Sequence, residues 1–360
     1  MDEVWAMGIR GRGRMSFAQR IVVVDCFAGP WKSAGDGSSP AILLNALNDA
    51  HEFWAPRRLQ KGGRAPELVA AFVENDDEAF PRLHRFVAER AGAVSTATLH
   101  TTFEAAVPQL QRLMGTDPAF LFVDPTGWKG VGMEAIGALC MHRGRAHQQP
   151  PRDVLINVMF DHINRFKDSD LHFIPGQMRA FFGLGDADLA SGLSEEALLS
   201  LYRRQLKHLG HLDHAADLIV PEPLQDRTKF RLVVGGRHPK TLAVFRDAEH
   251  KVCGAIAAQV RADAKARSAP TQQLGLFGTP RPPPRDGNYE SLYRGALNGL
   301  DNAILASLAP TGTPWEKLWP SLLEARHLRY ADRPQCCAAA GEGGPGARGR
   351  RGAEPPVQIA

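Results

Sequence analysis

Two short motifs about a hundred residues apart carry the residues best suited to chemistry: IVVVDCFAGPW at 21–31 and FLFVDPTGWKG at 120–130. Each is an apolar, β-branched run that ends on an aspartate and then breaks into a glycine-containing turn. This pattern is typical of a buried parallel strand. Ligands of open α/β sheets bind at the carboxyl ends of such strands. Asp25 is therefore a candidate binding residue, and Asp124, with Pro125 and Trp128 after it, is a candidate catalytic residue.

The first motif suits a nucleoside-type cofactor. Gly29 lies where the chain must turn sharply, and its missing Cβ lets a ligand approach the backbone. The motif is not GxGxxG, and no GxxxxGK[ST] is present, which argues against a pyrophosphate site and against an NTPase. S-Adenosyl-L-methionine (AdoMet) needs only a tight turn for its amino-acid end and a carboxylate for its ribose. The candidate cofactor-binding residues here are Asp25, Phe27, Ala28, Gly29 and Pro30.

Glu74 ends the next predicted strand and extends the acidic edge. A carboxylate at this position accepts two hydroxyl hydrogen bonds in ribose-binding sheets. Asn75 follows it and is a further candidate for cofactor binding. Alternatively, Asp25 and Glu74 only cap loops and bind water. Two acidic residues at strand ends about fifty residues apart favour the cofactor interpretation.

The second motif suits a target that carries hydrogen-bond donors. Pro125 fixes φ and lacks an N–H, so the Asp124 carboxylate and the Pro125 carbonyl remain as acceptors. Two acceptors can hold both N–H bonds of an exocyclic amino group and direct the nitrogen lone pair at a methyl donor. Trp128 could stack on a flat base, which is worth about 1–3 kcal/mol in comparable contacts. Alternatively, Trp128 is a core aromatic residue and Asp124 caps the following helix.

A third cluster lies in LINVMFDHINRF at 155–166. Asn157 within an apolar strand must find polar partners if it is buried, and we expect it to bind substrate. Asp161 is a candidate catalytic residue and His162 a candidate substrate contact on the same rim. A histidine beside an aspartate is more often a structural pair than a catalytic one.

The segment GGRHPK at 235–240 places Arg237, His238 and Lys240 on a predicted turn. Charged loop residues of this kind often contact phosphate or a target, so all three are candidate substrate-binding residues. The alternative is a simple turn with solvated charges.

An alternation of strands and helices must position these residues. The expected strands are 21–24, 68–73, 97–100, 119–123 and 154–160, and the expected helices between them are 41–50 (capped by Ser39), a helix ending near 90, 103–114 and 133–142. This order predicts a doubly wound parallel sheet. Further along, a helix at 195–209, an edge hairpin of 218–221 with 230–234 and a helix at 241–252 are expected.

Bulk properties exclude several classes of protein. The chain has 360 residues, a net charge of +4 and five scattered cysteines without a CxxC pair. Neither a disulfide framework, a structural zinc site nor any other metal site is indicated. The absence of a long apolar run argues against a membrane span, and we expect a cytoplasmic protein. The mild positive charge permits nucleic-acid binding without arguing for it.

The motifs together resemble the three-Cys-motif partner (TcmP) family of bacterial and phage-associated proteins. The resemblance rests on DCFAGPW, GDGSSPAILL, FVEND, FVDPTGWKG, LINVMFDHINRF and VVGGRHPKTLAVFRDAEHKV. It covers about residues 20–255 and, more weakly, a stretch to about 332. It implies a Rossmann-like, doubly wound, mostly parallel α/β sheet of the class I AdoMet-dependent methyltransferase type. A small helical module, often a winged helix in the family, follows.

The resemblance also implies an activity and partners. The activity is AdoMet-dependent methyl transfer to an amino group, such as that of a nucleic-acid base. The implied partners are a three-Cys-motif protein and nucleic acid. The expected organisation is a flexible N-terminus at 1–18, a methyltransferase-type domain at 19–265, a Pro/Gly-rich linker at 266–288, a helical module at 289–333 and a disordered tail at 334–360.

Two departures from the family pattern leave alternatives open. Trp31 stands where a second glycine is usual, and Thr126 stands where a phenylalanine is usual. Either change could weaken cofactor or base binding. The first alternative is therefore a non-catalytic Rossmann-fold partner of a three-Cys-motif protein. The second is a metal-dependent nuclease that uses Asp124, Asp161 and Glu74, although no ExK or HNH-like spacing accompanies them.

Overall fold

The structure, a computed structural model, describes most of the chain between residues 18 and 332. The described residues are 18–29, 37–141, 149–160, 163, 174–187, 189–190, 192–221, 228–256, 262–263, 288–309, 313–332 and 356–357. Pro30, Trp31, Asp161 and His162 lie outside them, as do nearly all of the predicted N-terminal segment, linker and tail.

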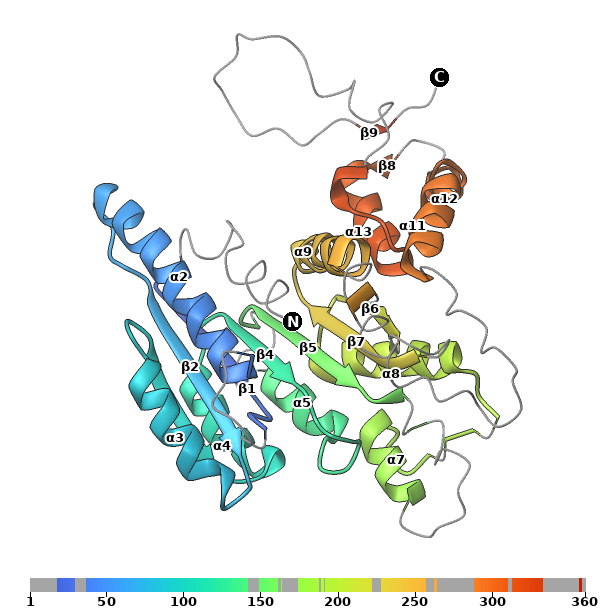
Figure 1. The fold of residues 1–360 in the computed structure, drawn as a ribbon. Helices are drawn as coiled ribbons and strands as arrows, with labels where there is room; N and C mark the ends of the chain where they lie inside the picture. The colour runs from blue at the N-terminus through green and yellow to red at the C-terminus, as the bar shows by residue number, and fades with distance from the viewer. Residues whose placement is uncertain are drawn as a thin grey trace. The chain divides into compact units, whose positions relative to one another are not determined.

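A seven-stranded mixed sheet forms the centre of the fold, with the strand order β3-β2-β1-β4-β5-β7-β6 (Figure 1). The strands are β1 (Arg20–Asp25), β2 (Glu67–Glu74), β3 (Ser95–His100), β4 (Ala119–Val123), β5 (Arg152–Val158), β6 (His214–Pro221) and β7 (Thr228–Gly236). The first five pair in parallel, and β7 is antiparallel to β5. The chain winds outward from β1 to β3 and then from β4 to the other edge. The switch point between β1 and β4 is where doubly wound sheets bind ligands.

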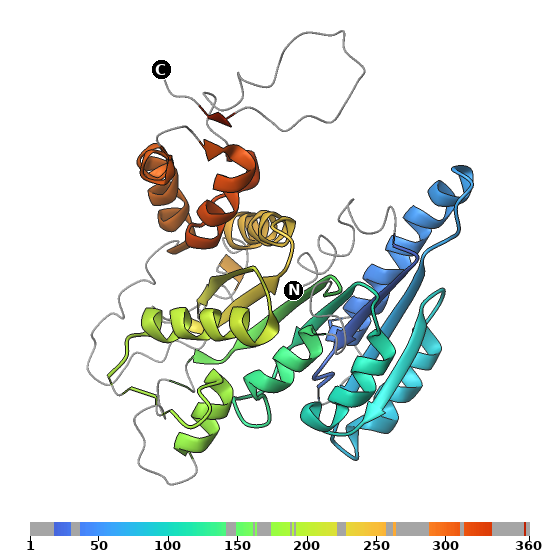
Figure 2. The ribbon, with the colours of Figure 1, turned by 180° about the vertical axis from the view of Figure 1, so that it is seen from behind.

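Helices cover both faces of this sheet (Figures 1 and 2). They are α2 (Ser39–Gln60), α3 (Ala79–Arg90), α4 (Phe103–Met114), α5 (Met133–Cys140), α7 (Ile174–Phe182), α8 (Glu195–Gly210) and α9 (Lys240–Glu249). Helices α2 and α3 contact each other, whereas α4, α5, α7 and α8 form a second group. The hydroxyls of Ser38, Thr102 and Ser194 accept hydrogen bonds from backbone N–H groups in the first turns of α2, α4 and α8. These local caps explain where the three helices begin.

The structure confirms the predicted order of elements and changes several bounds. Helix α2 ends at Gln60 rather than 50, and its cap is Ser38 rather than Ser39. Its added residues are mostly good helix formers, and the helix stops only before Gly62 and Gly63. Helix α7 has no counterpart among the predicted elements. Its Pro175 lies in the first turn, where proline is tolerated. The predicted edge hairpin is present as β6 and β7.

The chain divides into two compact units, Met1–Val220 with Thr228–Val244, and Pro221–Arg227 with Phe245–Ala360. The division falls within α9, whereas the sequence places a boundary after 265. The second unit contains the π-helix His250–Ile256, α11 (Asn288–Asn298), α12 (Leu300–Ser307) and α13 (Trp315–Ala325). Two-residue strands β8 (Thr313–Pro314) and β9 (Pro356–Val357) pair antiparallel.

A buried ion network lies within the second unit. Arg246 Nη1 donates to Glu249 Oε2 at 2.6 Å, and His327 Nδ1 lies 2.7 Å from Glu249 Oε1. Arg246 Nε also donates to the Leu323 carbonyl at 2.9 Å. The network therefore connects the end of α9 with α13 and the segment after it. Each helix within the described residues is too short or too polar to span a membrane.

Candidate functional site

Four polar residues from four strands share one face at the carboxyl edge of the sheet. Asp25 and Glu74 end β1 and β2, Asp124 follows β4, and Asn157 lies near the end of β5. The residue before each of them belongs to the hydrophobic cluster that also contains α4, α5 and α8. Because side chains alternate along a strand, the four polar residues lie on the opposite face, which α2 and α3 cover. The structure thus brings together residues that are up to 132 positions apart in the sequence.

Asp25 is fully buried at the centre of this group. Burial raises the pKa of its carboxyl to about 7, and the charges of Asp124 and Glu74 add to this rise. Its Oδ1 accepts a hydrogen bond from the Phe27 N–H at 3.2 Å. The Ser39 side chain also opposes the rise in the pKa of Asp25. The second carboxylate oxygen of Asp25, Oδ2, has no hydrogen-bond partner within the described residues. Asp25 therefore presents an unsatisfied buried acceptor beside the switch point.

The turn after Asp25 is held between the neighbouring strands. The Cys26 N–H donates to the Phe122 carbonyl at 2.8 Å, and the Ala28 N–H donates to the Val73 carbonyl at 2.9 Å. Gly29 then has a φ of +81°, and a Cβ built there would meet none of the described residues within 4 Å. Among these residues, the backbone of Gly29 therefore has open space beside it, as a ligand would require. Pro30 and Trp31 fall outside the described residues, so the obstruction by Trp31 stays a prediction.

Glu74 is 7% exposed and is anchored by its own loop. One carboxylate oxygen, Oε1, accepts from the Asp76 N–H at 2.8 Å. The hydrogen bonds between described residues leave its second oxygen, Oε2, able to accept from a ligand. Asn75 beside it is exposed.

A cluster next to Glu74 contains residues that were not candidates from the sequence. His100 lies in register with Glu74 on β3. Its ring stacks on Phe80 with centroids 4.4 Å apart, and its Nε2 lies 3.2 Å from the Asp77 carboxylate. The end of β3 has no acidic residue of its own, and Asp77 supplies one from the loop after β2. Only the parallel register of β2 and β3 reveals this, because 23 residues separate the two in sequence.

Asp124 and Asn157 form a direct pair across β4 and β5. Asn157 Nδ2 donates to Asp124 Oδ1 at 2.6 Å. Burial raises the pKa of the Asp124 carboxyl, and the hydrogen bond from Asn157 opposes that rise. Asn157 Oδ1 is buried and has no hydrogen-bond partner in the described part of the protein. The pair therefore leaves one oxygen of each side chain as an acceptor.

Trp128 is fixed at the rim by α7. Its Nε1 donates to Gln177 Oε1 at 3.1 Å, and its ring packs partly against the hydrophobic core. Pro125 is buried, whereas Thr126 is exposed. Trp128 thus combines features of both interpretations: it has core contacts, yet part of its surface remains accessible. Gln177 was not a sequence candidate, since α7 itself was not predicted.

Arg237, His238 and Lys240 lie at the opposite edge of the sheet. Because β7 is antiparallel, its end pairs with the start of β5, where Gly236 is opposite Asp153. Arg237 donates to the carbonyls of Cys140 at 2.6 Å and of Gly210 and His211 at 3.0 Å. Its guanidinium therefore joins backbone segments. These three residues therefore lie apart from the acidic strand ends, because an antiparallel strand reverses the edge to which its end belongs. Their contacts with substrate stay a prediction.

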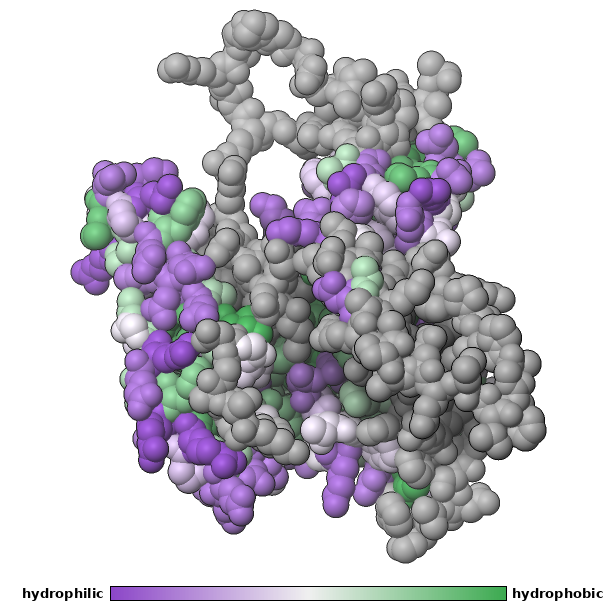
Figure 3. Space-filling model, viewed as in Figure 1, coloured by the Kyte–Doolittle hydropathy of each residue, from purple (hydrophilic) through white to green (hydrophobic). Residues whose placement is uncertain are grey.

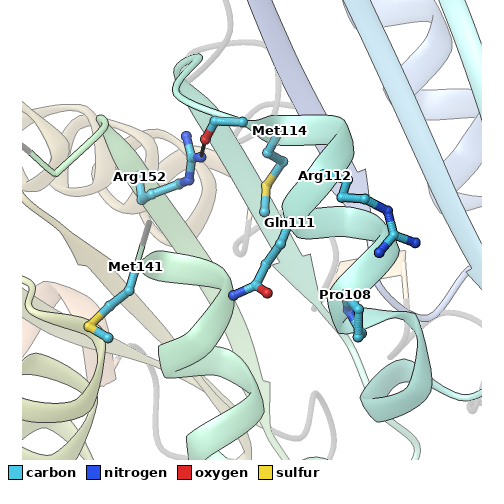
Figure 4. A pocket seen from close by; sticks show the side chains of 7 residues that line it. Pro108, Gln111, Arg112, Met114, Met141 and Arg152 are labelled. Atoms are coloured by element: carbon cyan, nitrogen blue, oxygen red, sulfur yellow. Dashed lines mark hydrogen bonds between the residues drawn. The ribbon is translucent and has the colours of Figure 1, made fainter. Parts of the chain in front are cut away.

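A cavity of about 390 Å³ also lies at this opposite edge, next to the end of α4 and the start of β5 (Figure 4). Met114, Met141 and Gln111 line it together with the buried Arg152. Arg152 Nη2 donates to the Gly115 carbonyl at 2.7 Å, and Nη1 donates to the Asp117 carbonyl. Arg152 is thus engaged with the backbone, and the cavity is separate from the candidate site.

The nuclease alternative requires a bound metal ion. Among the residues that the structure describes, no group of three or more His, Cys, Asp or Glu side chains is arranged to hold a metal ion. Asp161, one of the three carboxylates of that alternative, lies outside the described residues, and so does His162.

Comparisons with known proteins give similarity at the level of structure only. No family model matches the sequence, and no curated protein matches it. The O-methyltransferase TomG from Streptomyces achromogenes, solved in complex with SAM, is 14% identical, with 65% of this chain and 79% of that chain covered and a TM-score of 0.33. An O-methyltransferase from Bacillus cereus, solved with SAH, is 10% identical, with 64% and 80% covered and a TM-score of 0.31. A Legionella pneumophila protein is 7% identical, with 74% and 90% covered and a TM-score of 0.35.

At these low identities and TM-scores, the similarities carry no argument about activity. The strand order and the position of β7, which lies between β5 and β6 and is antiparallel to β5, identify the fold without them. The larger unit is a Rossmann-like, doubly wound, mostly parallel α/β sheet of the class I methyltransferase type, as the sequence predicts.

Proposed function

We propose that this protein is an AdoMet-dependent methyltransferase that binds its cofactor at the carboxyl edge of the sheet. The observation that carries the proposal is the buried Asp25, whose Oδ2 lacks a partner among the described residues beside the switch point. An unpaired buried acceptor costs about 1–3 kcal/mol, so a ligand that supplies donors or positive charge is favoured there. AdoMet has a cationic amino-acid end and ribose hydroxyls, and it fits an edge with several carboxylates.

The chain offers separate binding groups for two parts of such a cofactor, its amino-acid end and its ribose. Among the described residues, Gly29 has open space beside its backbone for the amino-acid end. Glu74 would accept hydrogen bonds from the ribose, with Asn75 next to it. When bound, AdoMet supplies an electrophilic methyl group at its sulfonium. The protein's contribution is then mainly to orient the reactants, which can account for much of a rate enhancement.

Asp124 and Pro125 would orient the acceptor nitrogen. The hydrogen bond from Asn157 fixes one Asp124 oxygen, which leaves the other for an N–H donor. Together with the Pro125 carbonyl, this makes two acceptors for one amino group, whereas a hydroxyl has a single hydrogen to donate. We therefore propose N-methylation, although two of the compared structures are O-methyltransferases. Asp161 remains a proposed further catalytic residue.

A nucleic-acid base is the proposed carrier of the amino group. The partly accessible ring of Trp128 could stack on a base, and a base within a duplex would first have to be flipped out. The resemblance to the TcmP family supports this target and suggests a three-Cys-motif protein as a partner. Cys26, Cys140 and Cys253 are free, which agrees with the proposed cytoplasmic location.

A non-catalytic partner of a three-Cys-motif protein is the second candidate function. Thr126 favours it, because this residue is exposed in the motif where the family usually has an aromatic ring. The fold would then be retained as a binding scaffold. Such a protein would keep the buried carboxylates but would not bind AdoMet.

Calorimetric titration with AdoMet and S-adenosylhomocysteine tests the proposal. We expect micromolar binding by the wild-type chain and at least tenfold weaker binding by Asp25→Asn and Glu74→Gln. The matched control is Glu67→Gln, which changes a carboxylate at the other end of β2 and should leave binding unchanged. The absence of binding by folded wild-type protein would contradict the methyltransferase proposal and favour the scaffold.

A further inference from the structure

The last turns of α2 extend beyond the sheet that the helix packs on. With 22 residues, α2 is about 33 Å long, whereas the six residues of β1 span about 20 Å. Beyond Ala50, only Ala55 of this helix is buried. Figures 1 and 2 show the end of α2 projecting past its neighbouring elements. This segment, with the turn that follows it, is called the α2 tip (residues 51–64).

The α2 tip exposes large apolar side chains that the core does not use. Phe53 is 49% exposed and Leu59 is 59% exposed. The Arg57 guanidinium lies 3.6 Å from the centre of the Phe53 ring, and its Nη1 donates to the Phe53 carbonyl at 2.6 Å. An aromatic ring with a cation against it is the kind of surface on which nucleic-acid bases stack.

The α2 tip is also strongly basic. It holds four basic residues, Arg57, Arg58, Lys61 and Arg64, and one acidic residue, so its net charge is +3, compared with +4 for the whole chain. Arg58 is engaged, because its Nη1 donates to the Ala18 carbonyl at 2.6 Å. The other three basic residues are exposed. Figure 3 shows mainly hydrophilic residues over this projecting end, with hydrophobic residues among them.

The carboxyl edge of the sheet, where the candidate site lies, has the opposite charge to the α2 tip. Asp76, Asp77 and Glu78 are exposed beside Glu74, and Asp25 and Asp124 lie on the same edge. Such an edge repels phosphate, and nucleic-acid affinity depends mainly on cationic contacts to phosphate. A nucleic-acid ligand therefore needs a basic surface elsewhere, and the α2 tip offers one.

We propose that the α2 tip is a nucleic-acid-binding surface. Arg57, Lys61 and Arg64 contact backbone phosphates, and Phe53 stacks on an unpaired base. The α2 tip would bind the backbone of the nucleic acid whose base is methylated, so the choice of nucleic acid as partner rests on the proposed function. Its test does not depend on methyl transfer or on AdoMet.

Fluorescence anisotropy with labelled single-stranded RNA and duplex DNA over a series of salt concentrations tests the surface. The full-length triple variant Arg57→Gln/Lys61→Gln/Arg64→Gln should bind at least tenfold more weakly at low salt. The slope of log affinity against log salt should become shallower by about 2–3, since each phosphate contact contributes about 0.7–0.9. Phe53→Ala should weaken binding to the single strand more than binding to the duplex.

The matched control is Arg82→Gln/Arg85→Gln/Arg204→Gln, which removes the same charge from exposed positions on α3 and α8. This control should keep the wild-type slope. Equal losses in both triple variants, an unchanged slope in the α2 variant, or no binding by the wild type would overturn the proposal. So would binding to anionic lipid vesicles without binding to nucleic acid. Failure of AdoMet to bind in calorimetry would leave these results unaffected.

Discussion

At the scale of single residues, Asp25 combines a stability penalty with a binding role. Its carboxyl is fully buried, and its pKa is raised from an ordinary value of 3.8 to about 7. Between these two pH values the folded state holds a proton that the unfolded state has lost. Stability therefore falls as pH rises from about 4 to about 7 and is constant above that range with respect to this group.

Asp25→Asn should remove this penalty. The amide keeps an acceptor for the Phe27 N–H but carries no charge, so the gain in stability at pH 8 is on the order of 4 kcal/mol or less. At pH 4 the variant and the wild type should be nearly equal. Urea unfolding at both pH values measures this. A gain of the same size at pH 4 would mean that ionisation of Asp25 is not the cause. The variant should also lose AdoMet affinity, a trade of function for stability.

Asn157 acts on Asp124 through a single hydrogen bond of 2.6 Å. Asn157→Leu has a similar volume but no donor, so the pKa of Asp124 should rise because burial is no longer opposed. Carboxyl ¹³C NMR titration, with Asp124→Asn for assignment, measures this directly. The acid limb of any methyl-transfer pH profile should move in the same direction.

Thr241→Val is the matched control for Asn157→Leu. Thr241 donates to Asp153 at 2.7 Å at the other end of β5. Its removal should affect stability and leave the pKa of Asp124 unchanged. An unaltered Asp124 titration in Asn157→Leu would show that the hydrogen bond does not control the carboxyl.

At the scale of elements, α5 and α8 approach so closely that their contact needs a glycine. A Cβ on Gly137 of α5 would lie 2.7 Å from the Leu209 carbonyl oxygen of α8. Backbone cannot move aside as a flexible side chain can. The close approach of α5 to α8 therefore depends on Gly137 as well as on the apolar side chains between the two helices.

Gly137→Ala should destabilise the protein by about 1–3 kcal/mol, because the clash outweighs the gain of up to about 1 kcal/mol in helix propensity. Thermal unfolding followed by calorimetry measures the change. Gly295→Ala in α11 is the matched control, since a Cβ there meets none of the described residues within 4 Å. That control should stabilise its own helix. A stabilised Gly137→Ala variant would mean that α5 and α8 are further apart than described.

At the scale of the whole molecule, the two compact units should respond to pH in opposite ways. Burial alone would raise the pKa of Glu249, but Arg246 and His327 outweigh it and hold the pKa below its ordinary value of 4.5. The stability that this carboxylate adds is present above that value and is lost as pH falls through the lower folded pKa. Asp25 in the other unit has the reverse dependence.

Calorimetry from pH 3.5 to 8 should therefore show two transitions whose order of stability changes with pH, since separate units need not unfold together. Acid should weaken the unit that contains Glu249. Glu249→Gln should lower the stability of that unit at neutral pH and reduce its further loss in acid. A single transition with one pH dependence would contradict this independence of the units.

The sequence predicts much of the fold because β-branched runs and helix patterns are local signals. Strand 119–123 and helix 103–114 have their predicted bounds. Among the candidate site residues, Asp25, Glu74 and Asp124 could be grouped because parallel strands all end at one edge. The bounds of α2 and the presence of α7 could not be predicted, since exposed helical turns and a helix with Pro175 and Gly176 in its first turn lack a clear pattern.

Sequence alone determined the alternation of strands and helices, the acidic strand ends and the missing phosphate-binding motifs. Only the tertiary structure decided which residues meet. In the folded chain Asn157 is hydrogen-bonded to Asp124, and Asp77 lies next to His100. Arg237 lies at the edge of the sheet away from the candidate site. Register and strand direction, which decide these positions, depend on contacts between distant segments. Burial, which raises the pKa of Asp25, is likewise a property of the packed fold and not of any local pattern.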